Sequence, residues 1–323
     1  MTYSQQRKEF PLIRTVCLNP ALDKTVQVPN FKLDAVSRIT EMRVDAGGKG
    51  INVSKVIKEL GGNSVAYALL AGNAGAQLER MVKDAGIEVV AQYAEGETRT
   101  NLKVVDAVNH TNTDINEPGP VVTDADLTAL LDRLVADIEE GDTVVLAGSI
   151  PAGAPVDTYA TWTKACKEAG AKVFLDADGA VFDAALDAGP TMVKPNDHEL
   201  SGLVGRTLSD IGEIAAAARE VMARGVEWVT VSMGGAGALF VTPERVLRAI
   251  SPKVKVGSTV GAGDSVVAAI AYAGDEGMSL EDTINLSMAT GSANVMQSGT
   301  QAAPRELVDS LIDKVGIEEV TED

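Results

Sequence analysis

Cysteine and histidine are scarce in this chain of 323 residues, which has two of each. Cys17 and Cys166 lie far apart in the sequence, and His110 and His198 show no spacing typical of metal ligands. These four residues therefore do not predict a metal site. Two isolated cysteines favour a reduced, cytoplasmic protein.

Positive charge is also in short supply. Lysine and arginine together number 28 against 46 aspartates and glutamates, so the formal net charge is −18. Such acidity argues against non-specific binding to nucleic acid and against anionic membranes. No apolar run reaches the length of a membrane span, and the polar stretch from Met1 to Phe10 does not resemble a signal peptide. An anionic substrate would therefore need a local cluster of positive groups.

Several common phosphate-binding signatures are missing. The chain has no G-x-x-x-x-G-K-[ST] motif and no protein-kinase catalytic loop. Gly261-Ala262-Gly263 is followed by Asp264-Ser265-Val266, so the dinucleotide-binding fingerprint breaks at its last glycine. The absence of the first motif excludes a P-loop enzyme. The broken fingerprint argues against a nicotinamide-dependent oxidoreductase.

What the chain does have is a regular alternation of short apolar runs and helical periodicity. Hydrophobic residues make up 45% of it, enough for a full core. Core strands are expected at Ile13 to Leu18, Val65 to Leu70, Thr143 to Ala147, Lys172 to Leu175, Thr191 to Val193 and Trp228 to Val231. Helices are expected at Ile51 to Leu60, Ala76 to Ala85, Asp124 to Ile138, Val156 to Ala169, Ile211 to Ala223, Gly261 to Gly274 and Leu280 to Gln297. The pattern predicts one α/β domain over residues 1–323, with a mainly parallel sheet covered by helices on both faces.

Two segments, about 22–46 and 96–117, do not fit this alternation. They contain short runs with half-exposed strand character, such as Thr25-Val26-Gln27-Val28 and Ser37-Arg38-Ile39-Thr40. We expect them to form a small β-sheet that stands off the core, with one apolar face to cover.

Glycine-rich turns follow several of the expected strands and should gather at the carboxyl edge of the sheet, where α/β proteins bind ligands. In the last of these turns, at about Gly261, a loop becomes a helix. Unpaired backbone N–H groups and the helix dipole make such a turn an anion site. Asp264 beside it suits a base that takes a proton from a hydroxyl while the N–H groups hold a phosphoryl group. The alternative is an acid that merely favours the helix dipole.

Three motifs in order resemble the ribokinase-like (PfkB) family of sugar kinases. They are Gly47-Gly48-Lys49-Gly50-Ile51-Asn52, Lys194-Pro195-Asn196-Asp197-His198-Glu199 and the segment from Ser258 to Ala269. Further features resemble the phosphosugar branch of that family, 1-phosphofructokinase and tagatose-6-phosphate kinase. These features are Asn19-Pro20-Ala21-Leu22-Asp23, Glu97-Thr98-Arg99-Thr100-Asn101 and Ile115-Asn116-Glu117-Pro118-Gly119-Pro120.

The resemblance implies a fold and a set of roles. It implies a three-layer α/β/α fold with the stand-off strands as a lid, Asp264 as the catalytic base, and Gly261, Ala262 and Gly263 as the anion hole. The residues implied to bind the sugar phosphate are Asp23, Arg38, Gly47, Gly48, Lys49, Asn52, Arg99, Asn101 and Ser149. Arg38 and Arg99, on the lid, would clamp the phosphate that the substrate already carries. Otherwise they are ordinary solvated arginines.

The same resemblance implies ATP and Mg²⁺ as cofactors. The nucleotide side would comprise Lys194, Asn196, Ser232, Gly234, Gly235, Gly237, Thr259, Gly261, Gly263 and Asn294, with Ser298 a weaker addition. Asn196 and Glu199 would organise the metal, mostly through water, since Mg²⁺ keeps much of its hydration shell. The alternative for Glu199 is an ordinary surface helix residue.

The expected activity is ATP-dependent phosphorylation of fructose 1-phosphate at its 6-hydroxyl. Tagatose 6-phosphate and fructose 6-phosphate remain open as substrates, because the sequence does not show where the pocket holds the phosphate. A non-catalytic sugar-phosphate sensor on the same fold is the rival from another class. The family also suggests a homodimer in which two lids clasp each other.

Overall fold

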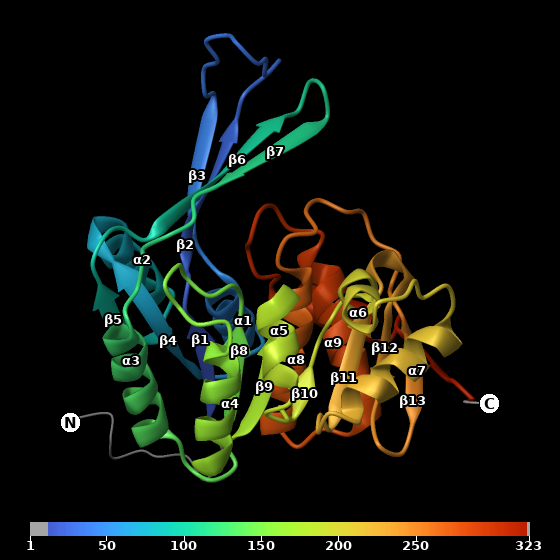
Figure 1. Cartoon of the computed structure of the whole chain (residues 1–323). Helices are drawn as coiled ribbons and strands as arrows, with labels where there is room; N and C mark the ends of the chain where they lie inside the picture. Colours follow the sequence, from blue (N-terminus) through green and yellow to red (C-terminus); the bar gives the residue numbers. More distant parts are fainter. Residues whose placement is uncertain (1–11, 322–323) are drawn as a thin grey trace.

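The computed structural model describes residues 12–321 (Figure 1). The expectation for Met1 to Phe10 lies outside these residues. Between residues 12 and 321 no helix is both long enough and apolar enough to cross a membrane.

A ten-stranded sheet lies at the centre, in the order β14-β13-β12-β11-β10-β9-β8-β1-β4-β5. The strands are β1 (Ile13–Cys17), β4 (Ser64–Ala71), β5 (Glu88–Ala94), β8 (Thr143–Ala147), β9 (Lys172–Asp176), β10 (Met192–Val193), β11 (Trp228–Ser232), β12 (Ala238–Val241), β13 (Val246–Ile250) and β14 (Gly316–Glu319). Pairing is parallel from β5 to β11 and antiparallel from β11 through β12 and β13 to β14. The predicted mainly parallel sheet is therefore confirmed, with an added antiparallel edge.

Helices cover both faces of this sheet. One layer contains α1 (Lys49–Glu59), α2 (Gly72–Asp84), α8 (Ala262–Asp275), α9 (Leu280–Asn294) and α10 (Arg305–Ile312). The other contains α3 (Asp124–Asp137), α4 (Thr158–Glu168), α5 (Gly179–Leu186), α6 (Asp197–Val204) and α7 (Ile211–Met222). Successive side chains of β8 point into opposite helix layers. Val144 and Leu146 belong to the core cluster on the side of α3 to α7, whereas Val145 and Ala147 belong to the cluster on the side of α1 and α8. The sheet is therefore buried on both sides, as the apolar strand sequences require.

A second, four-stranded sheet stands away from the core, at the top of Figure 1. It consists of β2 (Ala21–Gln27), β3 (Glu41–Gly47), β6 (Arg99–Asp106) and β7 (Thr111–Asn116), in the order β3-β2-β6-β7. We call these four strands the lid. Their positions confirm the stand-off sheet predicted for segments 22–46 and 96–117.

One detail of the lid prediction is wrong. Ser37 to Thr40 is predicted to be a strand, but residues 28–40 form a loop that is exposed from residue 32 onward, and β3 begins at Glu41. Strand β2 ends at Gln27, which pairs with Glu41, so the residues before Glu41 have no partner strand. The left-handed conformations of Asn30 and Asp34 also break the extended backbone.

Opposite faces of the lid differ in polarity because strand side chains alternate. Val26, Val28 and Val104 are buried together on one face, with Phe31 and Leu102 packed against them. The other face carries Asp23, Thr25, Arg99, Asn101 and Lys103, which line a pocket between the lid and the core. The lid thus presents its polar face to the carboxyl edge of the main sheet.

The chain order of the strands reverses at β1, which lies between β4 and β8. Such a switch point leaves a crevice at the carboxyl ends of the strands. The turns after β1, β8, β9 and β10 all meet there, and the following section describes the side chains that they supply.

Candidate active site

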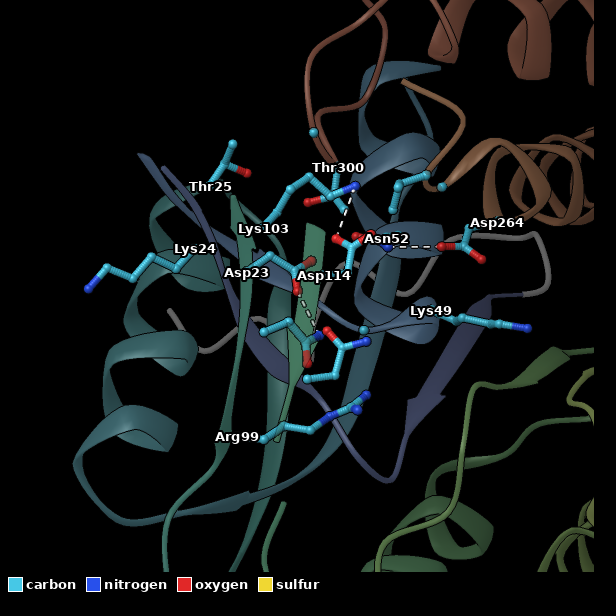
Figure 2. A pocket seen from close by; sticks show the side chains of 16 residues that line it. Asp23, Lys24, Thr25, Lys49, Asn52, Arg99, Lys103, Asp114, Asp264 and Thr300 are labelled. Atoms are coloured by element: carbon cyan, nitrogen blue, oxygen red, sulfur yellow. Dashed lines mark hydrogen bonds and ion pairs between the residues drawn. The ribbon is translucent and has the colours of Figure 1, made fainter. Parts of the chain in front are cut away.

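Asp264 lies in the first turn of α8, directly after the glycine turn. Gly261 is the N-cap of the helix and has a left-handed backbone with a φ of 80°, which favours glycine. The Asp264 side chain is almost fully buried, at 6% exposure, and its Oδ2 accepts a hydrogen bond of 2.8 Å from Nδ2 of Asn52 (Figure 2). The expected loop-to-helix transition at Gly261 is confirmed.

The acidity of Asp264 is perturbed. Burial, and next the negative charge of Asp176, raise its pKa to about 6, against the lowering effects of Asn52, Lys49 and Lys194. A carboxylate poised near neutral pH suits a general base, because it is ionised at pH 7 and still takes up a proton readily. Buried acids with raised pKa values are typical of functional sites.

Lys194 lies beside the first turn of α8. Its ammonium group is only 3.1 Å from the point where a Cβ would stand on Gly263. The missing side chain of Gly263 therefore leaves room for a buried cation next to the backbone N–H groups of the turn. Together they form a positively polarised site for an anion.

Asp176 was not singled out from the sequence, although it directly follows the strand predicted for Lys172 to Leu175 and ends β9 in the structure. Its Oδ1 lies 3.1 Å from Nζ of Lys49 and 3.5 Å from Nζ of Lys194. Burial works against ionisation of Asp176, but the two lysines hold its pKa below the usual range. The rule that polar residues at strand ends line the cleft would have found it.

The sugar-side residues come together where the lid joins the core. Nδ2 of Asn101 on β6 donates to Oδ1 of Asp23 on β2 over 2.9 Å. The Asp23 carboxylate packs directly on Gly47, where a Cβ would lie 2.0 Å from Oδ2. Gly48 is equally crowded, by Sγ of Cys17. The two glycines of this motif therefore allow close packing of β1 and β2 against the start of α1.

A pocket of about 380 Å³ opens between this cluster and Asp264. Figure 2 shows Asp23, Asn52 and Asp264 among its lining side chains, with Lys24 directed away from them. Its full lining is Asp23, Lys24, Thr25, Gly48, Lys49, Asn52, Arg99, Asn101, Lys103, Asp114, Asn116, Val260, Gly261, Asp264, Gly299 and Thr300. Half of these residues are not among the predicted site residues: Lys24, Thr25, Lys103, Asp114, Asn116, Val260, Gly299 and Thr300. Lys103, Asp114 and Asn116 lie on the pocket-facing side of β6 and β7.

The two lid arginines behave differently. Arg99 lines the pocket and donates from Nε and Nη2 to the carbonyl oxygen of Asn19, at 3.1 and 2.9 Å. Arg38 lies on the exposed loop before β3 and does not line this pocket. Ser149 is exposed, and its hydroxyl accepts a long hydrogen bond of 3.4 Å from Nδ2 of Asn19. Of the two arginines, the structure thus brings only Arg99 to the pocket.

The nucleotide-side residues, apart from Gly261, do not line this pocket. Asn196 and Glu199 form a capping box at the start of α6, in which Asn196 N–H donates to Oε2 of Glu199 and Glu199 N–H to Oδ1 of Asn196, both at 2.8 Å. The backbone N–H of Ser232 donates to the carbonyl of Pro195, which joins β11 to this motif. These residues form one continuous surface at the carboxyl ends of β10 and β11.

The glycines after β11 have different surroundings. At Gly234 and Gly235 the position that a Cβ would occupy has no atom within 4 Å, so a ligand has free approach to their backbone. Gly237 has a φ of 104° and packs on the carbonyl of Ala249, so it serves the turn into β12. Only the first two therefore fit close contact with a ligand.

The remaining predicted residues of this side support the glycine turn or the lid. Asn294 donates from Nδ2 to the carbonyl of Val260, at 3.3 Å, and Thr259 is exposed before it. Ser298 instead contacts the lid: Arg43 on β3 donates to its Oγ and to its carbonyl oxygen, at 3.0 and 2.8 Å. The last residue of α9 therefore contacts the glycine turn, and the loop after α9 contacts one edge of the lid.

The fold and the site together define a class of protein. A buried carboxylate near neutral pKa, beside a helix N-terminus and two lysines, suits transfer of a phosphoryl group to an alcohol. The polar, hydroxyl-matching groups of the lid suit a sugar as that alcohol. This is a phosphotransferase.

Comparison with known proteins gives the family. Residues 18–306 match the description "pfkB family carbohydrate kinase", and the chain belongs to that family of sugar kinases. It is 39% identical over 300 residues to 1-phosphofructokinase of Rhodobacter capsulatus, covering 93% of this chain and 95% of that one. It is 43% identical over 281 residues to 1-phosphofructokinase of Xanthomonas campestris, with coverages of 85% and 88%.

Solved structures agree with this assignment. Phosphofructokinase-2 of Escherichia coli in complex with fructose-6-phosphate superposes with a TM-score of 0.88 at 30% identity, covering 94% of this chain and 99% of that chain. The ribokinase-like fold expected from the sequence is therefore confirmed, and with it the activity of a sugar phosphotransferase that uses ATP.

Proposed function

We propose that this enzyme transfers the γ-phosphoryl group of ATP to the 6-hydroxyl of fructose 1-phosphate. The product is fructose 1,6-bisphosphate. The observation that carries the chemistry is Asp264, buried in the first turn of α8, bonded to Asn52 and open to the lid pocket. The substrate is supported by the two 1-phosphofructokinases to which the chain is 39% and 43% identical. All of residues 1–323 are assigned to one kinase domain with its lid.

In this proposal Asp264 orients the hydroxyl and accepts its proton as the oxygen attacks the γ-phosphorus. The bond from that phosphorus to the bridging oxygen breaks, and ADP leaves. The N–H groups of Gly261, Ala262 and Gly263 stabilise the charge on the transferring group, together with Lys194. Closure of the lid keeps water from reacting with ATP in place of the sugar.

The lid, the start of α1 and the turn after β8 supply the sugar-phosphate contacts. Asp23, Asn52 and Asn101 have the donors and acceptors needed for sugar hydroxyls. Arg99 binds the phosphate that is not transferred, with Ser149 and Lys49 nearby and Gly47 and Gly48 shaping the wall. The role predicted for Arg38, a second clamp on the same phosphate, stays a prediction, and Arg38 does not line the pocket described above. The guanidinium of Arg99 already donates two hydrogen bonds to the carbonyl oxygen of Asn19, which is consistent with a role in binding phosphate oxygens.

The nucleotide lies over Lys194, Ser232, Gly234, Gly235, Thr259 and Asn294, and Gly237 shapes the turn into β12 beside them. Mg²⁺, when bound, neutralises charge on the phosphate oxygens. Asn196 and Glu199 would hold its water shell. Across residues 12–321 no three Cys, His, Asp or Glu side chains converge on a metal position. One carboxylate and one amide fit an ion that keeps most of its waters and binds substrate phosphates.

The apolar face of the lid supports a homodimer. Met42 and Ile115 on that side are 57% and 53% exposed, and Leu33 and Val36 in the preceding loop are 89% and 88% exposed. Burying these side chains against a second lid would be favourable. The cytoplasmic location expected from the sequence stays a prediction, and free thiols at Cys17 and Cys166 are compatible with it.

A second substrate has one observation in its favour, the structural likeness to a phosphofructokinase-2 solved with fructose-6-phosphate. The deciding experiment measures ADP release with fructose 1-phosphate, fructose 6-phosphate and tagatose 6-phosphate. We expect kcat/KM to be highest by far for fructose 1-phosphate. A higher value for another sugar phosphate overturns the substrate assignment, and binding without turnover favours the sensor function.

A further inference from the structure

Asp176 stands at the meeting point of the two substrate sites. It is the last residue of β9 and is 1% exposed. Lys49 reaches it from the first turn of α1, on the sugar side, and Lys194 reaches it from the end of β10, on the nucleotide side. A single carboxylate oxygen, Oδ1, faces both ammonium groups.

Among residues 12–321 the partners of the Asp176 side chain are the two lysines. Its Oδ2 is buried with no hydrogen-bond partner there. A buried acceptor without a donor destabilises a fold. An apolar residue at this strand end would avoid that cost, so the carboxylate is better explained by what it does to the lysines.

Two neighbouring cations at the bottom of a cleft need a counter-charge. The Lys194 side chain is only 6% exposed, and burying an ammonium group without a partner is unfavourable. Lys49 and Lys194 also repel each other. Without Asp176 both side chains would turn toward solvent or toward Asp264, whose charge also acts on Lys49.

We propose that Asp176 is a positioning residue for phosphoryl transfer: its carboxylate holds the ammonium groups of Lys49 and Lys194 beside the glycine turn before either substrate binds. The two lysines then meet the phosphate groups of sugar and nucleotide without a prior rearrangement, which is the benefit of a preorganised site. This inference rests on the proposed function.

The same carboxylate influences Asp264. Its negative charge is the second-largest cause, after burial, of the raised pKa of Asp264. Removing that charge lowers the pKa of Asp264, because the repulsion between the two carboxylates is lost. A purely structural Asp176 would leave the pH profile of catalysis unchanged.

The test is steady-state kinetics between pH 5 and pH 9 on the wild type, Asp176→Asn and Asp178→Asn. Asp178 is an exposed carboxylate two residues further along, so its variant loses the same charge without touching the lysines. For Asp176→Asn we expect kcat to fall by about tenfold or more and the acidic midpoint of kcat/KM to move down by about one pH unit. Asp178→Asn should match the wild type. A wild-type kcat with an unshifted midpoint in Asp176→Asn overturns the proposal.

Asp176→Glu keeps the test decisive if Asp176→Asn does not fold. It retains the charge but moves the carboxylate by one methylene, so we expect a lower kcat with an unshifted acidic midpoint. An unchanged kcat would overturn the proposal. The assays use whichever sugar phosphate the wild type phosphorylates. If that substrate is not fructose 1-phosphate, the proposed function is refuted, but the comparison of the Asp176 variants with the wild type still tests this inference.

Discussion

Asn52 on α1 and Asp264 on α8 are 212 residues apart in the sequence and joined by a hydrogen bond of 2.8 Å. The amide nitrogen of Asn52 donates to Oδ2, so it favours the ionised carboxylate and fixes its orientation. The bond links the sugar-side motif to the glycine turn. Asp264 is therefore held both by its own helix and by α1, the helix that directly follows β3.

Replacing the base tests the core of the mechanism. Asp264→Asn keeps the shape of the side chain but cannot accept a proton. We expect kcat to fall by about 10²–10⁴-fold, the usual range for a lost general base, as measured by ADP release. Binding of the sugar phosphate, followed by isothermal titration, should change little. A variant with near wild-type kcat would show that another group serves as the base.

The pH dependence of catalysis follows from the pKa of Asp264. Because its pKa is about 6 and the base must be ionised, kcat/KM should rise with pH around a midpoint near pH 6. A rate profile from pH 5 to pH 9 checks this. A midpoint near pH 4, the ordinary range for an aspartate, would contradict it.

The same pKa has a consequence for stability. A carboxyl whose pKa is higher in the folded state binds its proton more tightly there, so its contribution to stability is present at low pH and is lost as pH rises through about 6. Asp264→Asn should therefore be more stable than the wild type at pH 8, by about 1–3 kcal/mol. The difference should shrink below pH 4. Thermal unfolding at both pH values measures it, and a destabilised variant at pH 8 would contradict the argument.

Arg99 is expected to act on the sugar phosphate alone. In Arg99→Ala, KM for fructose 1-phosphate should rise by about tenfold or more, whereas KM for ATP should stay within about twofold. Arg38→Ala, which removes the same charge from the exposed loop, should have the smaller effect. Equal effects of Arg99→Ala on both substrates would exclude the clamp.

Gly263→Ala tests the anion hole with one methyl group. The new Cβ would stand 3.1 Å from Nζ of Lys194, so the lysine must move although the backbone need not. We expect kcat to fall by about tenfold with little change in the unfolding temperature. Gly274→Ala, on the same helix with no atom within 4 Å of the new methyl group, is the matched control and should be fully active. Equal activity of both variants would show that Lys194 is not needed beside Gly263.

The lid dimer is tested by placing a charge on its apolar face. Met42→Asp should shift the protein toward the monomer, as measured by light scattering on a sizing column, because an aspartate cannot be buried there without cost. Val156→Asp introduces the same charge at an exposed valine just before α4 and should leave the assembly unchanged. A monomeric wild type, or an unaffected Met42→Asp, would refute the lid dimer.

Most of the fold could be predicted from the sequence where periodicity and turns agree. Thr143–Ala147 coincides with its predicted strand, and Trp228–Ser232 and Ile211–Met222 differ from prediction by one residue. The antiparallel strands β12 to β14 and the short helices α5 and α6 were not predicted. Their hydrophobic patterns are short and depend on contacts with distant parts of the chain, which single-sequence periodicity does not report.

The candidate site shows a similar limit. Motif residues such as Asp264 and Asn52 could be named, because loop chemistry and spacing mark them. Asp176 carries no local signal besides its place at a strand end. Arg38 and Arg99 both lie in segments predicted to be lid strands, but β3 begins at Glu41, so Arg38 lies in the loop before it. The face to which a strand side chain points depends on the residue at which pairing begins. The partner strand determines that residue, and β2 ends its pairing with β3 at Gln27 and Glu41.

The separation of Asn52 and Asp264 along the chain also sets when the site can exist during synthesis. Chains emerge from the ribosome with the N-terminal part first. By the time Ile250 has been added, the lid strands and the sugar-side motif are complete, but the glycine turn and its base have not been made. A nascent or prematurely terminated chain that ends before α8 therefore lacks the proposed base, and transfer of a phosphoryl group from ATP has to wait until α8 docks against α1.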